Sequence, residues 1–308
     1  MHVSALPARG HVVLAGRVRH IVPGNGFAGG VLAFRADRLL LVAIAAAGVA
    51  PPVARAAPAP VPVVAARTAA GKPDLSGVWQ ALNAAYWNVE DHAAGFGAVA
   101  SLGAAAAVHP GFGALAGKIP YLPAAAAQRA ENFKNRLTLD PEVKCLLPGV
   151  PRATYMPQPF QIVQTDRDIV IAYQYASAFR TIYMGEHGDA PVDSWMGWSS
   201  GRWEGDVLVV DVTGQNGQTW LDRAGNFGSA TLHVVERYIP QGRDHIWYEA
   251  TLEDPNVFAQ PWTISMPLYR HVEPNAQILE FKCEEFAEEV IYGHLRKPGT
   301  TPPDPPHD

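Results

Sequence analysis

From residue 160 onward the chain is a succession of short segments rich in Val, Ile, Tyr, Trp and Thr, separated by charged and Gly-containing turns. This feature constrains the fold most strongly, because such segments are typical of β-strands. Their regular spacing predicts an antiparallel meander that closes into a barrel or half-barrel, with a two-sheet sandwich as the alternative. The predicted strands cover residues 160–164, 169–175, 180–184, 202–203, 207–212, 231–238, 245–252, 263–269 and 277–283.

The segments on either side of this β-rich region differ from it in composition. Residues 80–143 include Ala- and Gly-rich stretches and predict an irregular arm or lid, with a helix over residues 123–137. Residues 284–295 predict a short amphipathic helix across the barrel end. We therefore expect a mainly β protein with an irregular, partly helical N-terminal arm and a short C-terminal helix, folded as a single domain over residues 71–297.

The N-terminal region carries the pattern of an export signal. Residues 39–50 read LLLVAIAAAGVA, an uncharged apolar run preceded by Arg35 and Arg38. This run is too short to span a bilayer, which needs about 20 residues, but it suits the apolar region of a signal peptide. Small residues at Ala54 and Ala56 predict cleavage near Ala56. We expect a signal peptide with an extended N-terminal region (1–56), a flexible linker (57–70), a disordered tail (298–308), no stable membrane anchor and a periplasmic or secreted location.

The charge balance argues against a nucleic-acid partner. Removing residues 1–56 takes away six of the 24 basic residues and one of the 29 acidic ones, which leaves a net charge of about −10. An acidic surface without a Lys/Arg run repels phosphate backbones. The sequence also lacks a GxxxxGKS phosphate-binding loop.

The two cysteines, Cys145 and Cys283, lie far apart in the sequence, and neither belongs to a CxxC or Cys/His ligand spacing. In an oxidising compartment such an even pair predicts a disulfide, with two buried free thiols as the alternative. A catalytic thiol is disfavoured because no His or Asn lies near either cysteine in the sequence.

Several ordered motifs are shared with a known protein family. They include PDLSGVW (73–79), ENFKNRLTLDPEVKCLLPGVPRATYMP (131–157), WMGWSSGRWEGD (195–206) and TWLDRAGNF (219–227). Through these motifs the chain resembles an uncharacterised family of secreted bacterial proteins, over nearly all of residues 71–297. The resemblance implies export and a lipocalin-like β-barrel. Residues 77–79 likewise resemble the Gly-x-Trp opening strand of lipocalin-like barrels, in which the Trp fills the closed end.

The chain departs from this family at a few polar positions. Relatives commonly read GFNDQTW and NFHSDALHVVER, where this chain has Gln215, Gly217, Gly228 and Ala230 in place of a Phe, an Asp, a His and an Asp. If those polar groups serve chemistry in the relatives, this chain has lost part of it. The departures favour binding over catalysis.

A cluster of aromatic and polar residues predicts a ligand site. Trp195 and Trp198 are flanked by Asp193 and followed by Arg202. Ligand sites are commonly apolar pockets with a few convergent polar groups, and alternation along a strand would direct at least one Trp into a cavity. The alternative is that both Trp side chains belong to the core or the rim.

His233 is the strongest candidate for proton transfer, because imidazole titrates near neutral pH. Strand alternation places His233 on one face and Glu236 on the other, and Tyr248 lies in a neighbouring predicted strand. We expect Asp193 or Glu236 as the acid partner of His233 and Tyr248 as a ligand contact. A structural role is the alternative for each of these residues.

Two classes of function fit these observations. The first is an exported lipocalin-like barrel that binds a small hydrophobic or aromatic molecule in its cavity. The second is a cofactor-independent barrel enzyme, a lyase, isomerase or hydrolase, that uses His233 as general acid or base. Residues 87–92 combine two carboxylates and an imidazole, but their spacing does not predict a metal site, and no cofactor is expected.

Overall fold

The computed structural model describes residues 65–95, 108, 110–115, 117–165 and 167–295. The chain divides into two units, Met1–Pro58 and Ala59–Asp308, and the described residues all belong to the second. The predicted signal peptide (1–56) and tail (298–308) lie outside the described residues. Of the predicted linker, residues 65–70 are described, and Arg67 in this stretch forms an ion pair of 2.6 Å with Asp206.

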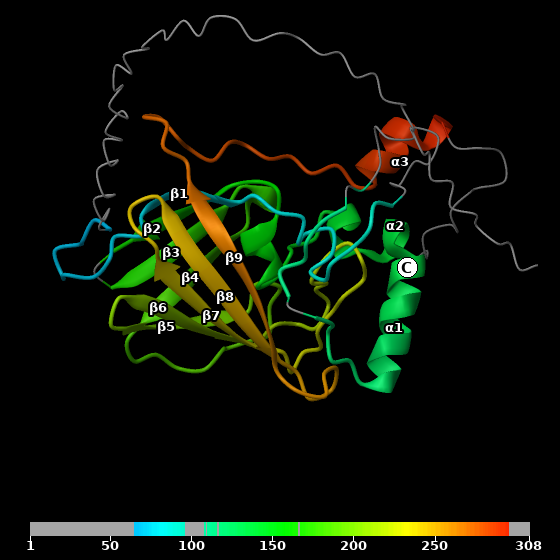
Figure 1. Cartoon of the computed structure of the whole chain (residues 1–308), viewed down its shortest axis with the longest axis horizontal. Coiled ribbons are helices and arrows are strands. Elements are labelled where there is room, and N and C mark those ends of the chain that lie inside the picture. The colour runs from blue at the N-terminus through cyan, green and yellow to red at the C-terminus, as the bar shows by residue number, and fades with distance from the viewer. Residues whose placement is uncertain (1–64, 96–107, 109, 116, 166, 296–308) are drawn as a thin grey trace, which may run out of the picture. The chain divides into compact units, whose positions relative to one another are not determined.

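The strands described form one closed barrel, in which neighbours in the sequence are neighbours in the sheet and β9 pairs with β1 (Figure 1). The predicted mainly β, lipocalin-like barrel is thereby confirmed. The strands are β1 (Gly77–Ala81), β2 (Phe160–Gln164), β3 (Asp168–Tyr173), β4 (Phe179–Met184), β5 (Trp198–Glu204), β6 (Val207–Thr213), β7 (His233–Pro240), β8 (His245–Glu253) and β9 (Trp262–Arg270).

The barrel departs from a pure antiparallel meander at one position. β4 and β5 pair in parallel, with Ile182 opposite Ser199, whereas the other neighbouring strands are antiparallel. Parallel neighbours need a long crossover, and residues 185–197 supply it. Asp193 and Trp195 consequently lie in this connection and not in a strand.

Alternation along the strands separates the barrel interior from its outer face. In β7 the side chains of Val234, Glu236 and Tyr238 are buried, whereas those of His233 and Arg237 are half-buried on the other side. The neighbouring β8 alternates in the same way. Burial of the inward-facing aliphatic and aromatic side chains forms the core.

The Trp of the Gly-x-Trp segment in the opening strand β1 is part of the core. Trp79 is 1% exposed and donates its indole N–H to the Leu75 carbonyl over 2.9 Å. The guanidinium of Arg270 lies 4.2 Å from the centroid of the Trp79 ring, a favourable cation–π contact. Gly77 has a φ of +142°, a conformation that L side chains rarely adopt, which explains the glycine.

Helices lie outside the strands, mainly before β2 and after β9 (Figure 1). The predicted helix over residues 123–137 is present as α1 (Pro123–Lys134) and α2 (Arg136–Leu139), with a break at Asn135. The C-terminal helix is α3 (Ala287–Tyr292). Short 3₁₀ helices complete the fold: η2 (Pro141–Lys144), η3 (Arg152–Tyr155), η4 (Tyr175–Ser177) and η5 (Gly293–Leu295).

The predicted strand over residues 277–283 is wrong, because this segment carries no strand structure. The pairing of β9 with β1 closes the barrel and leaves no free edge for a further strand. The segment is instead tied down by the predicted disulfide, which is confirmed: Cys145 and Cys283 are bonded, with their Cα atoms 5.6 Å apart.

The segment after the disulfide contacts the arm. The Phe286 amide donates to the Val143 carbonyl over 2.7 Å, and Glu288 of α3 pairs with Arg223 at 2.9 Å. These contacts join the segment to the arm and to the loop of residues 222–226, and the position of the helix across the barrel end stays a prediction. In the described part of the chain, no helix combines the length and the apolar character that a membrane crossing requires.

Candidate functional site

The interior of the barrel holds a polar cluster around one ion pair. Arg180 on β4 donates two hydrogen bonds, of 2.7 and 2.9 Å, to the carboxylate of Glu236 on β7. Tyr238 and Tyr248 also donate to this carboxylate, over 3.1 and 2.8 Å. All four side chains are buried. Side chains therefore occupy this level of the barrel and satisfy one another.

The electrostatics keep the two phenols neutral and the guanidinium charged. Burial raises the pKa of Tyr238 and Tyr248 well above its usual value, and the charge of Glu236 raises it further. Burial is the largest effect on Arg180 and lowers its pKa, but the charge of Glu236, its hydrogen bonds and the neighbouring tyrosines together raise the pKa well above its usual value, so the guanidinium stays charged. Two neutral phenols and one closed ion pair offer no free polar group to a ligand.

His233 lies on the outer face of the barrel. Its Nε2 is 3.1 Å from Oδ1 of Asp211, and both side chains are about one-third exposed. Asp211 also pairs with Arg202, which is itself exposed. The predicted partners His233 and Glu236 thus face opposite sides of β7, as alternation indicates, and Glu236 is instead joined to Tyr248.

Trp198 of the predicted site also lies away from the barrel interior. Trp198 stacks on Tyr183 with ring centroids 4.4 Å apart, and its indole N–H donates to the Gly188 carbonyl over 3.1 Å. Trp195 is half-buried in the crossover connection, where Asp193 is exposed. The structure therefore does not gather Trp198, His233 and Glu236 around one cavity, and the roles predicted for these residues stay predictions.

A cavity of about 380 Å³ lies outside the barrel, between residues 87–95 of the arm, the helices α1 and α2, and residues 223–224. We call it the arm cavity. Its volume is in the range of small-molecule sites. Two aromatic rings, three arginines and one carboxylate are its main chemical groups: Trp87, Phe133, Arg129, Arg136, Arg223 and Glu288.

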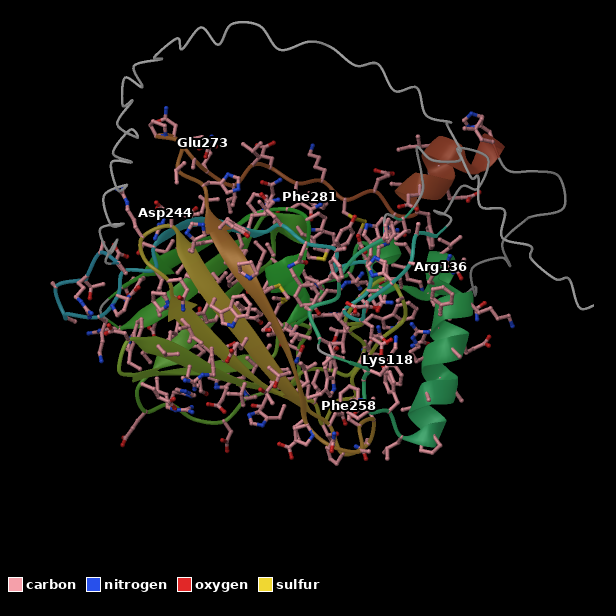
Figure 2. All side chains as sticks on the ribbon, viewed as in Figure 1. Lys118, Arg136, Asp244, Phe258, Glu273 and Phe281 are labelled. Atoms are coloured by element: carbon pink, nitrogen blue, oxygen red, sulfur yellow. A yellow bond between two sulfur atoms is a disulfide. The ribbon has the colours of Figure 1, made fainter. Side chains whose placement is uncertain are left out.

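One wall of the arm cavity is built by α1 and α2. Arg129 and Phe133 are one helical turn apart on α1, so their side chains meet, and the Arg129 guanidinium lies 5.3 Å from the ring centroid. Arg136 lies at the start of α2 (Figure 2), 4.4 Å from the same ring, and donates to the Phe133 carbonyl over 2.8 Å. Two guanidiniums thus flank one half-exposed ring.

The opposite wall is built around Arg223. Its guanidinium lies 4.5 Å from the Trp87 ring centroid and pairs with Glu288 at 2.9 Å and with Glu142 at 3.5 Å. Burial lowers the pKa of Arg223, and the two carboxylates raise it by more, so it remains charged. Arg223 is therefore a neutralised cation, held by contacts to the arm and to α3.

The loop that carries Arg223 is fixed by Asp222, which is fully buried. Asp222 accepts hydrogen bonds from the backbone amides of Val89, Ala224 and Asn226, at 2.8, 2.9 and 3.2 Å, and from the Asn226 side chain at 2.6 Å. Asn226 in turn accepts from Arg129 Nε over 3.2 Å. This network holds the arm, the loop and α1 together and so shapes the cavity.

Two walls of the arm cavity approach closely because of one glycine. Gly225 has a φ of +82°, and a Cβ there would lie 2.8 Å from atoms of Asn132 and Phe133. Asn132 donates to the Gly225 carbonyl over 3.1 Å. The loop and α1 are therefore in direct contact, which brings residue 223 next to residue 129.

Sequence reasoning missed the arm cavity. Its residues are separated by more than 130 positions along the chain, from Trp87 to Arg223, and no local spacing brings them together. A partial signal existed in the shared motifs, because ENFKNRLTLD contains Phe133 and Arg136 and TWLDRAGNF contains Arg223. The structure shows that these two motifs meet at one cavity.

Comparison of the chain with protein-family models, with curated proteins and with solved structures finds no match. The resemblance to a family of secreted bacterial proteins therefore stays a proposal. Within the described ranges, no three His, Cys, Asp or Glu side chains are placed to hold a metal ion.

Proposed function

We propose that this chain is an exported protein that binds a small molecule with an aromatic or apolar body in the arm cavity. The observation that carries the proposal is the contrast between two spaces. The barrel interior around Arg180 and Glu236 is occupied by its own side chains, whereas the arm cavity offers about 380 Å³ beside Trp87 and Phe133. Aromatic rings at the edge of a cavity are favourable partners for aromatic ligands.

Export is supported by two features. The apolar run at residues 39–50 suits a signal peptide, and the Cys145–Cys283 disulfide suits an oxidising compartment. Expression of the full chain in a bacterium, followed by fractionation and N-terminal sequencing, tests this part of the proposal. We expect protein in the periplasm or medium that begins near Ala57. Cytoplasmic protein that retains residues 39–50 would contradict it.

Binding is tested with the full chain purified under native conditions. Native mass spectrometry should detect a small molecule that remains bound, and isothermal titration calorimetry should detect binding of a neutral probe, 2-naphthol. Replacement of Trp87 by Ala should weaken this binding by about ten-fold, because one ring wall and its apolar area are lost.

Trp198→Ala is the matched control, since Trp198 packs on the outer face against Tyr183. We expect this variant to bind 2-naphthol as the parent protein does. Binding that is lost in Trp198→Ala and unchanged in Trp87→Ala would place the ligand outside the arm cavity and contradict the proposal. Circular dichroism of each variant shows whether the fold is kept.

A further inference from the structure

We infer that the ligand of the arm cavity is an organic anion, a carboxylate on an aromatic or apolar body, whose charged group is bound by Arg129 and Arg136. This inference rests on the proposed function and specifies the chemical class of the ligand. It follows from the balance of charge in the cavity, from the donors left free there, and from the way these donors are held.

The balance of charge in the arm cavity is positive. Its walls contain three arginines and one carboxylate, that of Glu288. This carboxylate pairs with Arg223, which is also paired with Glu142. Within the described residues no carboxylate lies within ion-pair distance of Arg129 or Arg136. Two cations therefore face the cavity without a counter-ion among the described residues.

The surroundings disfavour the charged form of Arg136. Burial lowers the pKa of Arg136, and the positive charge of Arg223 lowers it further. Both effects show that the surroundings disfavour the charged form. A ligand anion would offset the repulsion between Arg136 and Arg223 and would replace the water lost from the Arg136 guanidinium. Binding of an anionic group to the free protein is therefore favourable.

Donors remain available on both guanidiniums. Arg136 uses one N–H to reach the Phe133 carbonyl, and Arg129 uses Nε to reach Asn226. A guanidinium has five N–H donors in a fixed planar fork. The remaining donors of Arg129 and Arg136 have no hydrogen-bond partner within the described ranges. A carboxylate matches this planar geometry and accepts two parallel hydrogen bonds from one guanidinium.

Phe133 holds the two guanidiniums in place. Both lie over its ring, at 5.3 and 4.4 Å from the centroid, so each planar fork has lost part of its freedom before a ligand arrives. Apolar groups line much of the rest of the cavity, including Leu137, Val108 and the Trp87 ring, beside Asn88 and His92. This combination favours a carboxylate with an apolar body over a small inorganic anion, which would leave the apolar part of the cavity unfilled.

The test compares two probes of the same shape, 2-naphthoate and the neutral 2-naphthamide, by isothermal titration calorimetry with the full chain. We expect 2-naphthoate to bind at least ten-fold more tightly than 2-naphthamide. Arg136→Gln and Arg129→Gln should each weaken 2-naphthoate binding by about ten-fold and change 2-naphthamide binding less than two-fold. Arg202→Gln is the control, because Arg202 lies on the outer face of the barrel with Asp211, and it should change neither affinity.

The outcomes separate this inference from the proposed function. Equal affinity for the two probes, with both lost in Trp87→Ala, would overturn the anionic class of the ligand and leave the cavity as a binding site. Tighter binding of 2-naphthoate that is insensitive to Arg129→Gln and Arg136→Gln would overturn the assignment of the two arginines. Displacement of 2-naphthoate by millimolar inorganic phosphate would overturn the choice of a carboxylate. Absence of binding for both probes would overturn the inference and the proposed function together.

Discussion

The guanidinium of Arg180 and the carboxylate of Glu236 meet inside the barrel through two hydrogen bonds, of 2.7 and 2.9 Å, and neither side chain is more than 4% exposed. They link β4 to β7 across the interior. A lipocalin-like barrel can hold a ligand in this space. Here the ion pair, with Tyr238 and Tyr248 on the same carboxylate, occupies it. This relationship is the reason to look for the ligand site outside the barrel.

Removal of one member of this pair should destabilise the protein strongly. Arg180→Met leaves the carboxylate of Glu236 buried without a cation, which costs about 3–5 kcal/mol. The double variant Arg180→Met/Glu236→Leu removes both charges and should lose less stability than Arg180→Met alone. Urea unfolding of the parent and the variants measures these free energies. The single variant Glu236→Leu completes the set. If the stability lost by the double variant equalled the sum of the losses in Arg180→Met and Glu236→Leu, the two side chains would not interact energetically.

The disulfide should contribute substantially to stability. Cys145 and Cys283 are 138 residues apart, and closing a loop of this length stabilises the fold by about 4–5 kcal/mol in the chain-entropy model. We expect the double variant Cys145→Ser/Cys283→Ser to unfold at markedly lower urea concentration than the parent. A reducing agent should destabilise the parent and have no effect on the variant. Equal stability of the parent with and without reductant would contradict this expectation.

Because of Asp222, the free energy of unfolding should fall as the pH rises. Burial raises the pKa of Asp222 from 3.8 to about 6, although hydrogen bonds from Asn226 and Val89 oppose the rise. Because this pKa is higher in the folded chain than in the unfolded chain, the contribution is fully present below pH 3.8 and is lost as the pH rises through 6. The loss amounts to about 3 kcal/mol.

The comparison variant for this effect is Asp222→Asn, which cannot titrate. It should be less stable than the parent throughout, since an amide offers one acceptor oxygen where the carboxylate offers two. The stability difference between parent and variant, measured by urea unfolding from pH 4 to pH 7, should shrink by about 2.4 kcal/mol as the pH rises. A difference that is constant over this range would show that the pKa of Asp222 is not raised.

His233 should be dispensable for binding and nearly so for stability. Its Nε2 lies 3.1 Å from Oδ1 of Asp211 on the exposed outer face, and exposed pairs of this kind contribute about 0–1 kcal/mol. We expect His233→Ala to keep the affinity for 2-naphthoate and to lose less than 1 kcal/mol of stability. If the chain were an enzyme that uses His233 as general base, the same variant would instead slow turnover by about 10²- to 10⁴-fold.

The strands were predictable because β-branched and aromatic residues alternate with turns, and this local pattern is enough to place β2, β6 and β8 closely. Alternation also predicted that His233 and Glu236 face opposite sides of β7. Pairing was less predictable. The parallel neighbours β4 and β5 depend on how the crossover of residues 185–197 runs, and the sequence of that segment carries no signal of its direction.

The candidate site was not predictable for a related reason. Trp87, Phe133 and Arg223 come together only because the loop at Gly225 packs against α1. Such a contact depends on long-range packing and leaves no periodic trace in the sequence. The cluster of aromatic and polar residues around Trp198 was more visible, yet the structure places Trp198 on the outer face, where it stacks on Tyr183.

The most direct test of the proposed site is a crystal structure of the full chain with 6-bromo-2-naphthoate, in which anomalous scattering locates the bromine. We expect one bromine peak in the arm cavity between Trp87 and Phe133, with the carboxylate within hydrogen-bond distance of Arg136. The ion pair of Arg180 and Glu236 should stay intact in the same crystal. A bromine peak inside the barrel beside Glu236, with the arm cavity holding only water, would contradict the proposal.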